Sequence, residues 1–428
     1  MLFSHEVFAQ ELLSLDQAIA IGLKNNYSIR ISNNNATMAQ NDNYIGNAGI
    51  LPSLNLNATG NLSNNNINQN YSSGLELNLP GVNSNTLTYG AALNWTLFDG
   101  FKMFVTYDKL GVLEDLGNIN AKITIETTVT NIIDAYYDVV RQKQLVKVIK
   151  DAIAVNDEKV NLAETKYNIG KSSKLDYLQS TVDLNAQKSL LLKQNETYAN
   201  AKVTLNQLLA RNTDLDFTVI DTIIVSYKPA LEDLRKSTLL QNNILKSFEK
   251  NTKIAELSLK QYQAQRYPTI GLGLNYNFSK VNNQAGFILL NQNSGLSIGL
   301  TATYNLFNGS ILNHQIDDAE INLENSNLQF KDYKSQVEAG LMKAWKTYQT
   351  DLEALKLEED NLLVAKENLD VAMERYRLGS SSSIEFKDAQ QSFEDSEGRV
   401  VQARYDAKVA ETELMRLNGE LVKGSGIK

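Results

Sequence analysis

A seven-residue spacing of apolar residues marks two long stretches of the chain. In the first stretch the apolar positions are Ile132, Val139, Val146, Ile153, Val160 and Tyr167. In the second stretch they are Leu341, Tyr348, Leu355, Leu362, Leu369 and Tyr376. A sustained seven-residue repeat is typical of helices that supercoil around one another. Because the same spacing resumes after Gly170 and after Gly379, the pattern predicts two long helical hairpins, each with a glycine at its tip.

A period of two replaces the period of seven in four other segments, at about residues 53–63, 87–98, 269–280 and 295–307. In the first segment Leu54 and Leu56 alternate with Asn55 and Asn57. Such alternation predicts strands with one apolar and one small polar face. A small sheet packed on a helix would show the same pattern. A bilayer-spanning strand fits better, because about 9–11 tilted residues cross the hydrocarbon. We expect the strands to be joined by long loops rich in Asn, Gly and Ser.

The sequence contains two similar copies of the same pattern. The segment Leu97-Phe98-Asp99-Gly100 recurs as Leu306-Phe307-Asn308-Gly309, 209 residues later. The tip glycines Gly170 and Gly379 are also 209 residues apart, whereas Pro52 and Pro268, at the starts of two strands, are 216 apart. Two copies are too few for a solenoid, so the pattern indicates an internally duplicated fold.

The duplication divides the chain into two structural repeats. We expect the first repeat at residues 11–228, with a helix, two strands and a helical hairpin whose tip lies at 168–174. The second repeat covers residues 229–420, with its tip at 377–383. Residues 1–10 are expected to be the remnant of a signal peptide or a disordered N-terminus, and residues 421–428 a flexible tail.

Composition excludes several classes of function. The 428 residues include 41 Lys and Arg against 49 Asp and Glu, a net charge of −8, which disfavours a nucleic-acid surface. There is no cysteine, and the two histidines, His5 and His314, are far apart, so thiolate and histidine-centred sites are excluded. No phosphate-binding GxxxxGK[ST] motif occurs. We therefore predict no enzyme activity, no catalytic or metal site and no cofactor.

Four membrane strands cannot close a barrel by themselves. An open sheet edge in lipid leaves unpaired N–H and C=O groups, each costing several kcal/mol, and the smallest familiar barrels need about eight strands. Three copies of the chain would supply an even total of about twelve strands. The predicted fold class is therefore mainly helical with membrane strands. Internally duplicated long helical hairpins form a trimeric α-barrel tunnel, and four strands per chain contribute to a twelve-stranded transmembrane β-barrel with a polar lumen.

These features together resemble the TolC-type outer-membrane efflux and secretion channel family, from about residue 14 to residue 420. The resemblance is carried by the two Leu-Phe-Asp/Asn-Gly turns, the proline-led strands, Glu374–Gly379 through Asp388–Gln391, Ala403–Asp406 and Leu417–Gly419. It implies a homotrimer in the cell outer membrane, in contact with its lipid and extending into the periplasm. Residues 211–230, with the β-like segment Phe217–Ile220, and the C-terminal tail would form a belt around the helices.

The resemblance also implies a function. The chain would be the passive exit duct of a tripartite efflux pump or a type I secretion system, docked to a periplasmic adaptor protein and an inner-membrane transporter. Small-molecule efflux and protein secretion share this architecture, so the cargo stays open. The alternative is a soluble or surface-exposed coiled-coil adhesin without a pore.

The resemblance places a periplasmic gate at the hairpin tips. Its constricting carboxylates correspond to Glu385 and Asp388, and its latch to Tyr376, Asp176 and Ser381. Ser381 stands where the family has an arginine, and a serine cannot make a charge-assisted bond to a carboxylate; Arg377 or Lys174 are candidates to replace it. In a trimer the two acidic positions, three residues apart on one helix face, would make a cation-selective ring.

Each tip assignment has a plainer alternative. Ser382 with Glu385, and Ser173 with Asp176, have the spacing of a helix-capping box. The tip pairs Gly170-Lys171 and Gly379-Ser380 correspond to the family's adaptor-docking surface. The glycines alone would also be explained as helix terminators in a left-handed conformation.

Overall fold

A computed structural model of the chain describes residues 12–421. It contains two compact units. The helical unit comprises residues up to Ala36, Asn118–Ser247 and residues from Phe330 onward, and the sheet unit comprises Thr37–Gly117 and Phe248–Gln329. The two expected chain ends, residues 1–10 and most of 421–428, lie outside the described residues.

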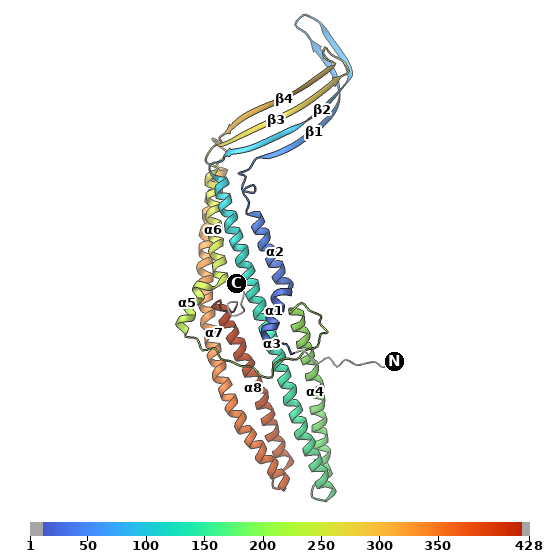
Figure 1. The fold of residues 1–428 in the computed structure, drawn as a ribbon, viewed down its shortest axis with the longest axis vertical. Helices are drawn as coiled ribbons and strands as arrows, with labels where there is room; N and C mark the ends of the chain where they lie inside the picture. The colour runs from blue at the N-terminus through green and yellow to red at the C-terminus, as the bar shows by residue number, and fades with distance from the viewer. Residues whose placement is uncertain (1–11, 422–428) are drawn as a thin grey trace, which may run out of the picture. The chain divides into compact units, whose positions relative to one another are not determined.

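Eight helices are present in the described part of the chain, and their bounds repeat (Figure 1). In chain order they are α1 (Leu15–Asn25), α2 (Tyr27–Asp42), α3 (Lys102–Asn168), α4 (Lys174–Leu208), α5 (Leu231–Gln241), α6 (Asn243–Ala264), α7 (Ile311–Leu378) and α8 (Ser383–Leu417). Helices α1 and α5 have the same length and start 216 residues apart, and α4 and α8 likewise start 209 apart. The α3/α4 and α7/α8 hairpins are those that the seven-residue spacing predicts.

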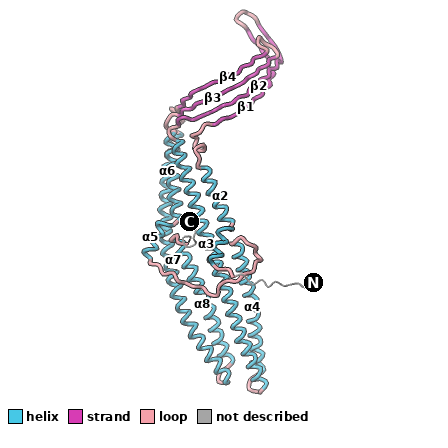
Figure 2. The backbone as a smooth tube through the Cα atoms, in the orientation of Figure 1, coloured by secondary structure: helices cyan, strands magenta, loops and turns pink. Residues whose placement is uncertain are grey.

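The sheet unit contains four antiparallel strands in the order β1-β2-β3-β4 (Figure 2). The strands are β1 (Ser53–Asn70), β2 (Glu76–Phe98), β3 (Thr269–Asn283) and β4 (Leu290–Thr303). The predicted fold class, mainly helical with duplicated hairpins and four strands in each chain, is confirmed.

The prediction of long loops between the strands is wrong. Strands β1 and β2 are joined by residues 71–75, and β3 and β4 by residues 284–289. Pairing continues into the Asn-rich segments because it needs only backbone groups, and side-chain amides reinforce it. Asn64 Nδ2 donates to Asn83 Oδ1 at 2.7 Å, and Ser84 Oγ donates to Asn283 Oδ1 at 2.7 Å.

The predicted strand at 295–307 also has wrong bounds, since β4 begins at Leu290 and ends at Thr303. Its pairing partner β3 begins at Thr269, opposite Thr303. Residues 304–307 therefore pair with no strand of the described chain, although their sequence alternates.

One face of the sheet is apolar and uncovered. Residues opposite one another share a face, and Leu54, Leu93, Leu274 and Ile298 lie in one such row. Leu56 is 85% exposed and Leu300 is 69% exposed. The predicted alternation of apolar and polar residues is thus confirmed. The apolar face of the sheet does not pack on helices within the sheet unit. Between residues 12 and 421 no helix is both long and apolar enough to cross a membrane.

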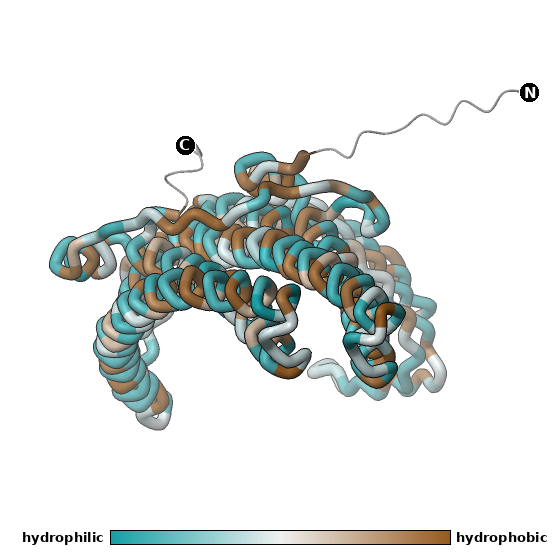
Figure 3. Tube along the Cα trace, turned by 90° about the horizontal axis from the view of Figure 1, so that it is seen from below, coloured by the Kyte–Doolittle hydropathy of each residue, from teal (hydrophilic) through white to brown (hydrophobic). Residues whose placement is uncertain are grey.

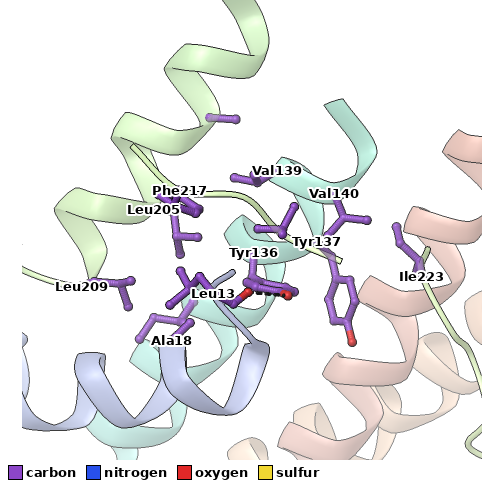
Figure 4. Packing of buried hydrophobic residues seen from close by; sticks show 13 residues of the cluster. Leu13, Ala18, Tyr136, Tyr137, Val139, Val140, Leu205, Leu209, Phe217 and Ile223 are labelled. Atoms are coloured by element: carbon purple, nitrogen blue, oxygen red, sulfur yellow. Dashed lines mark hydrogen bonds between the residues drawn. The ribbon is translucent and has the colours of Figure 1, made fainter. Parts of the chain in front are cut away.

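The core of the helical unit gathers around Tyr136 on α3 (Figure 4). The Tyr136 hydroxyl donates to the Leu13 carbonyl at 3.0 Å, and Phe217 and Leu205 are buried beside it. The β-like segment Phe217–Ile220 forms one isolated parallel bridge, Leu12 to Thr218. Residues 211–230 are therefore held by buried side chains and by helix side chains that donate to their carbonyl groups, such as Lys143 to Val219 at 2.6 Å. Along the hairpin helices, apolar and polar positions alternate around each helix (Figure 3), as expected for helices with one buried stripe.

Candidate functional site: the hairpin tips

Both hairpins turn through the same backbone motif. Gly170 and Gly379 have φ of 72° and 74°, a left-handed conformation that favours glycine. The amide of Lys171 donates to the Lys166 carbonyl at 2.8 Å, and that of Ser380 donates to the Arg375 carbonyl at 2.9 Å. This pattern is a Schellman cap, so the interpretation of the glycines as helix terminators is confirmed.

The next helices start with serine caps. The Ser173 hydroxyl accepts from the Asp176 amide, and the Ser382 hydroxyl accepts from the Glu385 amide, each at 3.2 Å. Among the described residues neither pair completes the capping box, since the Asp176 and Glu385 carboxylates accept from Ser172 and Ser381 instead. The interpretation of Asp176 and Glu385 as first-turn residues of serine-capped helices is correct. It is compatible with a second role, because capping uses their backbone amides and leaves their carboxylates free for other partners.

The tips present apolar side chains to solvent. Ile169 is 61% exposed and Leu378 is 74% exposed, next to the tip glycines. Leu175 and Ile384 occupy matching positions at the start of α4 and α8 and are also exposed. Lys171 and Ser380 are exposed between them. Each tip is thus a small apolar surface that no residue of the described chain covers.

Tyr376 is buried at the contact between the two hairpins. Its ring stacks on the Phe386 ring of α8, with centroids 5.5 Å apart. From α3, Lys166 places its Nζ 4.1 Å from the centre of the Tyr376 ring and donates to the Tyr376 carbonyl. Burial raises the pKa of the Tyr376 phenol, and the charge of Asp176 raises it further.

Asp176 is held by its own hairpin. Its carboxylate accepts from the Ser172 hydroxyl at 2.7 Å, and this bond lowers the pKa of Asp176, with the charge of Lys166 acting in the same direction. Among the described residues no hydrogen bond joins Tyr376 directly to Asp176. Lys166 interacts with both groups, so the structure connects the two predicted latch residues through a lysine.

The remaining predicted gate residues lie on the second hairpin. Ser381 donates to Glu385 Oε2 at 2.8 Å, a contact within one hairpin. Glu385 and Asp388 are both exposed near the start of α8. Ser381 therefore positions a predicted ring carboxylate and does not reach the first hairpin.

Sequence reasoning missed most of the contacts that join the hairpins. Arg377, named as a candidate, pairs with Glu158 of α3. Asp183 of α4 accepts from Lys387 of α8 at 2.8 Å and pairs with the buried Lys159 of α3 at 3.1 Å. Lys159 directly precedes Val160 of the apolar seven-residue spacing. Its position next to Val160 in the sequence is the feature that indicates its burial.

Comparison with known proteins identifies a family. The sequence model described as "Outer membrane efflux protein" matches residues 19–211 and 234–420. The chain is 21% identical over 339 residues to the outer membrane efflux protein BepC of Brucella suis, covering 78% of this chain and 73% of that protein. It is 20% identical over 369 residues to the outer membrane protein TolC of Escherichia coli, covering 80% and 71%.

Solved structures show the same fold. The outer membrane channel CmeC of Campylobacter jejuni superimposes with a TM-score of 0.80 at 15% identity, covering 95% of this chain and 85% of that chain. The outer membrane protein VceC of Vibrio cholerae superimposes with a TM-score of 0.76 at 18% identity, covering 95% and 96%.

Proposed function

Because this chain belongs to the outer membrane efflux protein family, whose members are outer membrane channels and not enzymes, we propose that it is the exit duct of a tripartite assembly. Three copies form a channel in the outer membrane. Substrates pass through it from the periplasm to the exterior after it docks to a periplasmic adaptor and an inner-membrane transporter.

The uncovered apolar face of the sheet is the observation that carries this proposal. The face holds exposed leucines such as Leu56 and Leu300. The sheet ends in β1 and β4, and within residues 12–421 each of these strands pairs on one side only. In water such a face and such edges are aggregation-prone. In a bilayer the face is satisfied by lipid, and the edges by neighbouring copies that close a twelve-stranded barrel.

The hairpin tips are the proposed gate and docking surface. Glu385 and Asp388 form the constriction, with Ser381 positioning Glu385. Tyr376 and Asp176 belong to the latch, with Lys166 as the connecting cation. The exposed apolar residues beside Gly170, Lys171, Gly379 and Ser380 are suited to receive adaptor helices, since exposed apolar patches of this kind mark interaction sites.

Reconstitution tests the duct. The purified protein is expected to have the mass of three chains in detergent, by light scattering, and to give discrete single-channel currents in planar bilayers. A monodisperse monomer that stays in solution without detergent would instead support the adhesin alternative. A trimer that inserts but never conducts would contradict the duct while leaving the assembly intact.

The constriction has its own test. Replacing Glu385 with Gln and Asp388 with Asn is expected to lower the cation preference of the channel and its block by divalent cations, because six carboxylates would leave the ring. Reversal potentials under a salt gradient measure this. Replacing Glu367 with Gln and Asp370 with Asn is the matched control, since it removes equal charge from exposed positions of α7. An unchanged reversal potential in the first variant would exclude these residues as the ring.

A further inference from the structure

We propose that β4 of one copy pairs with β1 of a neighbouring copy in one register, in which Thr301 lies opposite the neighbouring copy's Thr59. The inference rests on the proposed trimer and specifies how its copies join. The register is obtained from the internal duplication. In a ring built from equivalent repeats, the junction between two copies should match the junction between the two repeats of one chain.

The strand pairs confirm that the two sequence offsets hold in the sheet. Leu54 of β1 lies opposite Leu93 of β2. Shifting Leu54 by 216 residues and Leu93 by 209 gives Ile270 and Ala302, which lie opposite one another in β3 and β4. The two hairpins therefore have the same register, although their strands and connections differ in length.

The junction between the repeats inside the chain predicts the junction between copies. In that internal junction, Ala92 of β2 lies opposite Asn275 of β3. Moving each residue by its offset places Thr301 of β4 opposite Thr59 of β1. The same shift places Ala302 opposite Ala58, and Ile298 opposite Leu62.

The faces of the sheet agree with this register. Ala58 and Leu62 lie on the same face as Leu54 and Leu56, and Ala302 and Ile298 lie on the face of Leu300. The shift therefore joins apolar face to apolar face. A slip of one residue would turn one strand over and put its leucines into the polar face.

The turn after each second strand gives independent support. Gly100 and Phe101 have φ of 72° and 68°, and Gly309 and Ser310 have φ of 68° and 64°, so the two turns have the same backbone. A Cβ on Gly100 would lie 2.2 Å from the Ala264 carbonyl oxygen, whereas nothing lies within 4 Å of one on Gly309.

The same sequence offset predicts which residues of a neighbouring copy would cover Gly309. Ala264 and Tyr267, which press on Gly100, correspond to Ala48 and Leu51. Leu51 is exposed, and so are Leu306 and Phe307 beside Gly309. The neighbouring copy's Leu51 segment thus covers this turn, and its β1 gives residues 304–307 the partner strand that they lack within one chain.

Cysteine pairs test the register directly, because the 428 residues of the sequence include no cysteine. Of the two neighbouring pairs Thr59→Cys with Thr301→Cys and Ala58→Cys with Ala302→Cys, the one with the closer spacing is expected to form disulfides between copies under mild oxidation. Covalent dimers and trimers would then appear on a non-reducing denaturing gel. Two neighbouring pairs are used because opposed residues alternate between closer and wider spacing, and a disulfide needs the closer approach.

The controls separate this inference from the proposed trimer. Ala92→Cys with Asn275→Cys, the equivalent pair within one chain, should oxidise without a change in mass. Asn57→Cys with Thr301→Cys, slipped by two residues on the same face, should cross-link weakly. Trimers by light scattering that cross-link best through the slipped pair, or through neither pair, would overturn the register. Absence of trimers in the unsubstituted protein would instead overturn the proposed assembly.

Discussion

Replacing Asp183 with alanine is expected to destabilise the tip region of the hairpins by about 3–5 kcal/mol, because it leaves a buried cation unpaired. The Lys159 side chain is 1% exposed, and its Nζ lies 3.1 Å from Asp183 Oδ2. Without that carboxylate, Lys159 keeps the face of the Phe386 ring at 5.7 Å and the longer-range charge of Glu394, neither of which replaces the ion pair. Faster amide hydrogen exchange near the start of α4 and of α8 would report the loss, together with a lower thermal midpoint by circular dichroism.

Two further variants identify the cause of that loss. Lys387→Ala should cost about 1 kcal/mol or less, since Lys387 is half exposed and Lys159 keeps Asp183. Lys159→Met combined with Asp183→Leu should recover most of the stability, because apolar replacement of a buried ion pair is often neutral. A double variant as labile as Asp183→Ala would show that lost packing, and not the unpaired charge, is responsible.

The same pair has a defined pH dependence. Burial opposes ionisation of Asp183, but hydrogen bonds from Lys387 and Lys159 lower its pKa overall. A carboxyl pKa that is lower in the folded state adds stability above its ordinary pKa, and this stability is lost as the pH falls through the lowered value. The difference in stability between Asp183→Ala and the unsubstituted protein should therefore shrink in strongly acidic buffer.

The helical hairpins could be predicted because the apolar pattern extends over many residues. Six apolar positions at seven-residue spacing, from Ile132 to Tyr167, indicate a supercoiling helix. A glycine in a left-handed conformation ends the first helix of each hairpin. Strand bounds were harder, because the period of two stops where asparagines begin. Residues 64–70 pair through backbone groups and side-chain amides, which no apolar alternation reveals. Strand β4 ends for another reason: Thr303 lies opposite Thr269, the first residue of β3, so its partner strand stops there.

At the tips, the resemblance located the region but not its contacts. Tyr376 belongs to the apolar spacing, so its burial could be predicted. Its neighbour Lys166 could not, since a lysine beside an apolar stripe normally extends to water. The burial of Lys159 could not be predicted either, for the same reason. The departure at Ser381 was visible in the sequence, but which cation bridges the hairpins depends on how two helices cross, and side-chain spacing along one helix does not encode that.

Replacing Lys166 and Arg377 together with alanine is expected to raise the conductance of the resting channel, because both cations hold the first hairpin to the second. Lys166 donates to the Tyr376 carbonyl and lies over the Tyr376 ring, and Arg377 pairs with Glu158. A cation–π contact contributes about 0.5–2 kcal/mol, and an exposed ion pair about 1 kcal/mol or less. Their combined loss of about 1–3 kcal/mol corresponds to roughly a 5- to 150-fold change in the ratio of open to closed tips.

The matched control removes the same charge from the same region. Lys171→Ala with Lys174→Ala takes away two exposed cations that make no contact with the second hairpin among the described residues. Single-channel recordings at low salt should show a higher open fraction for the Lys166/Arg377 variant than for this control. The excess should fall as salt rises, because screening weakens the Glu158–Arg377 pair of the unsubstituted channel. Equal conductance in the two variants would mean that charge near the pore, and not a latch between hairpins, sets the resting state.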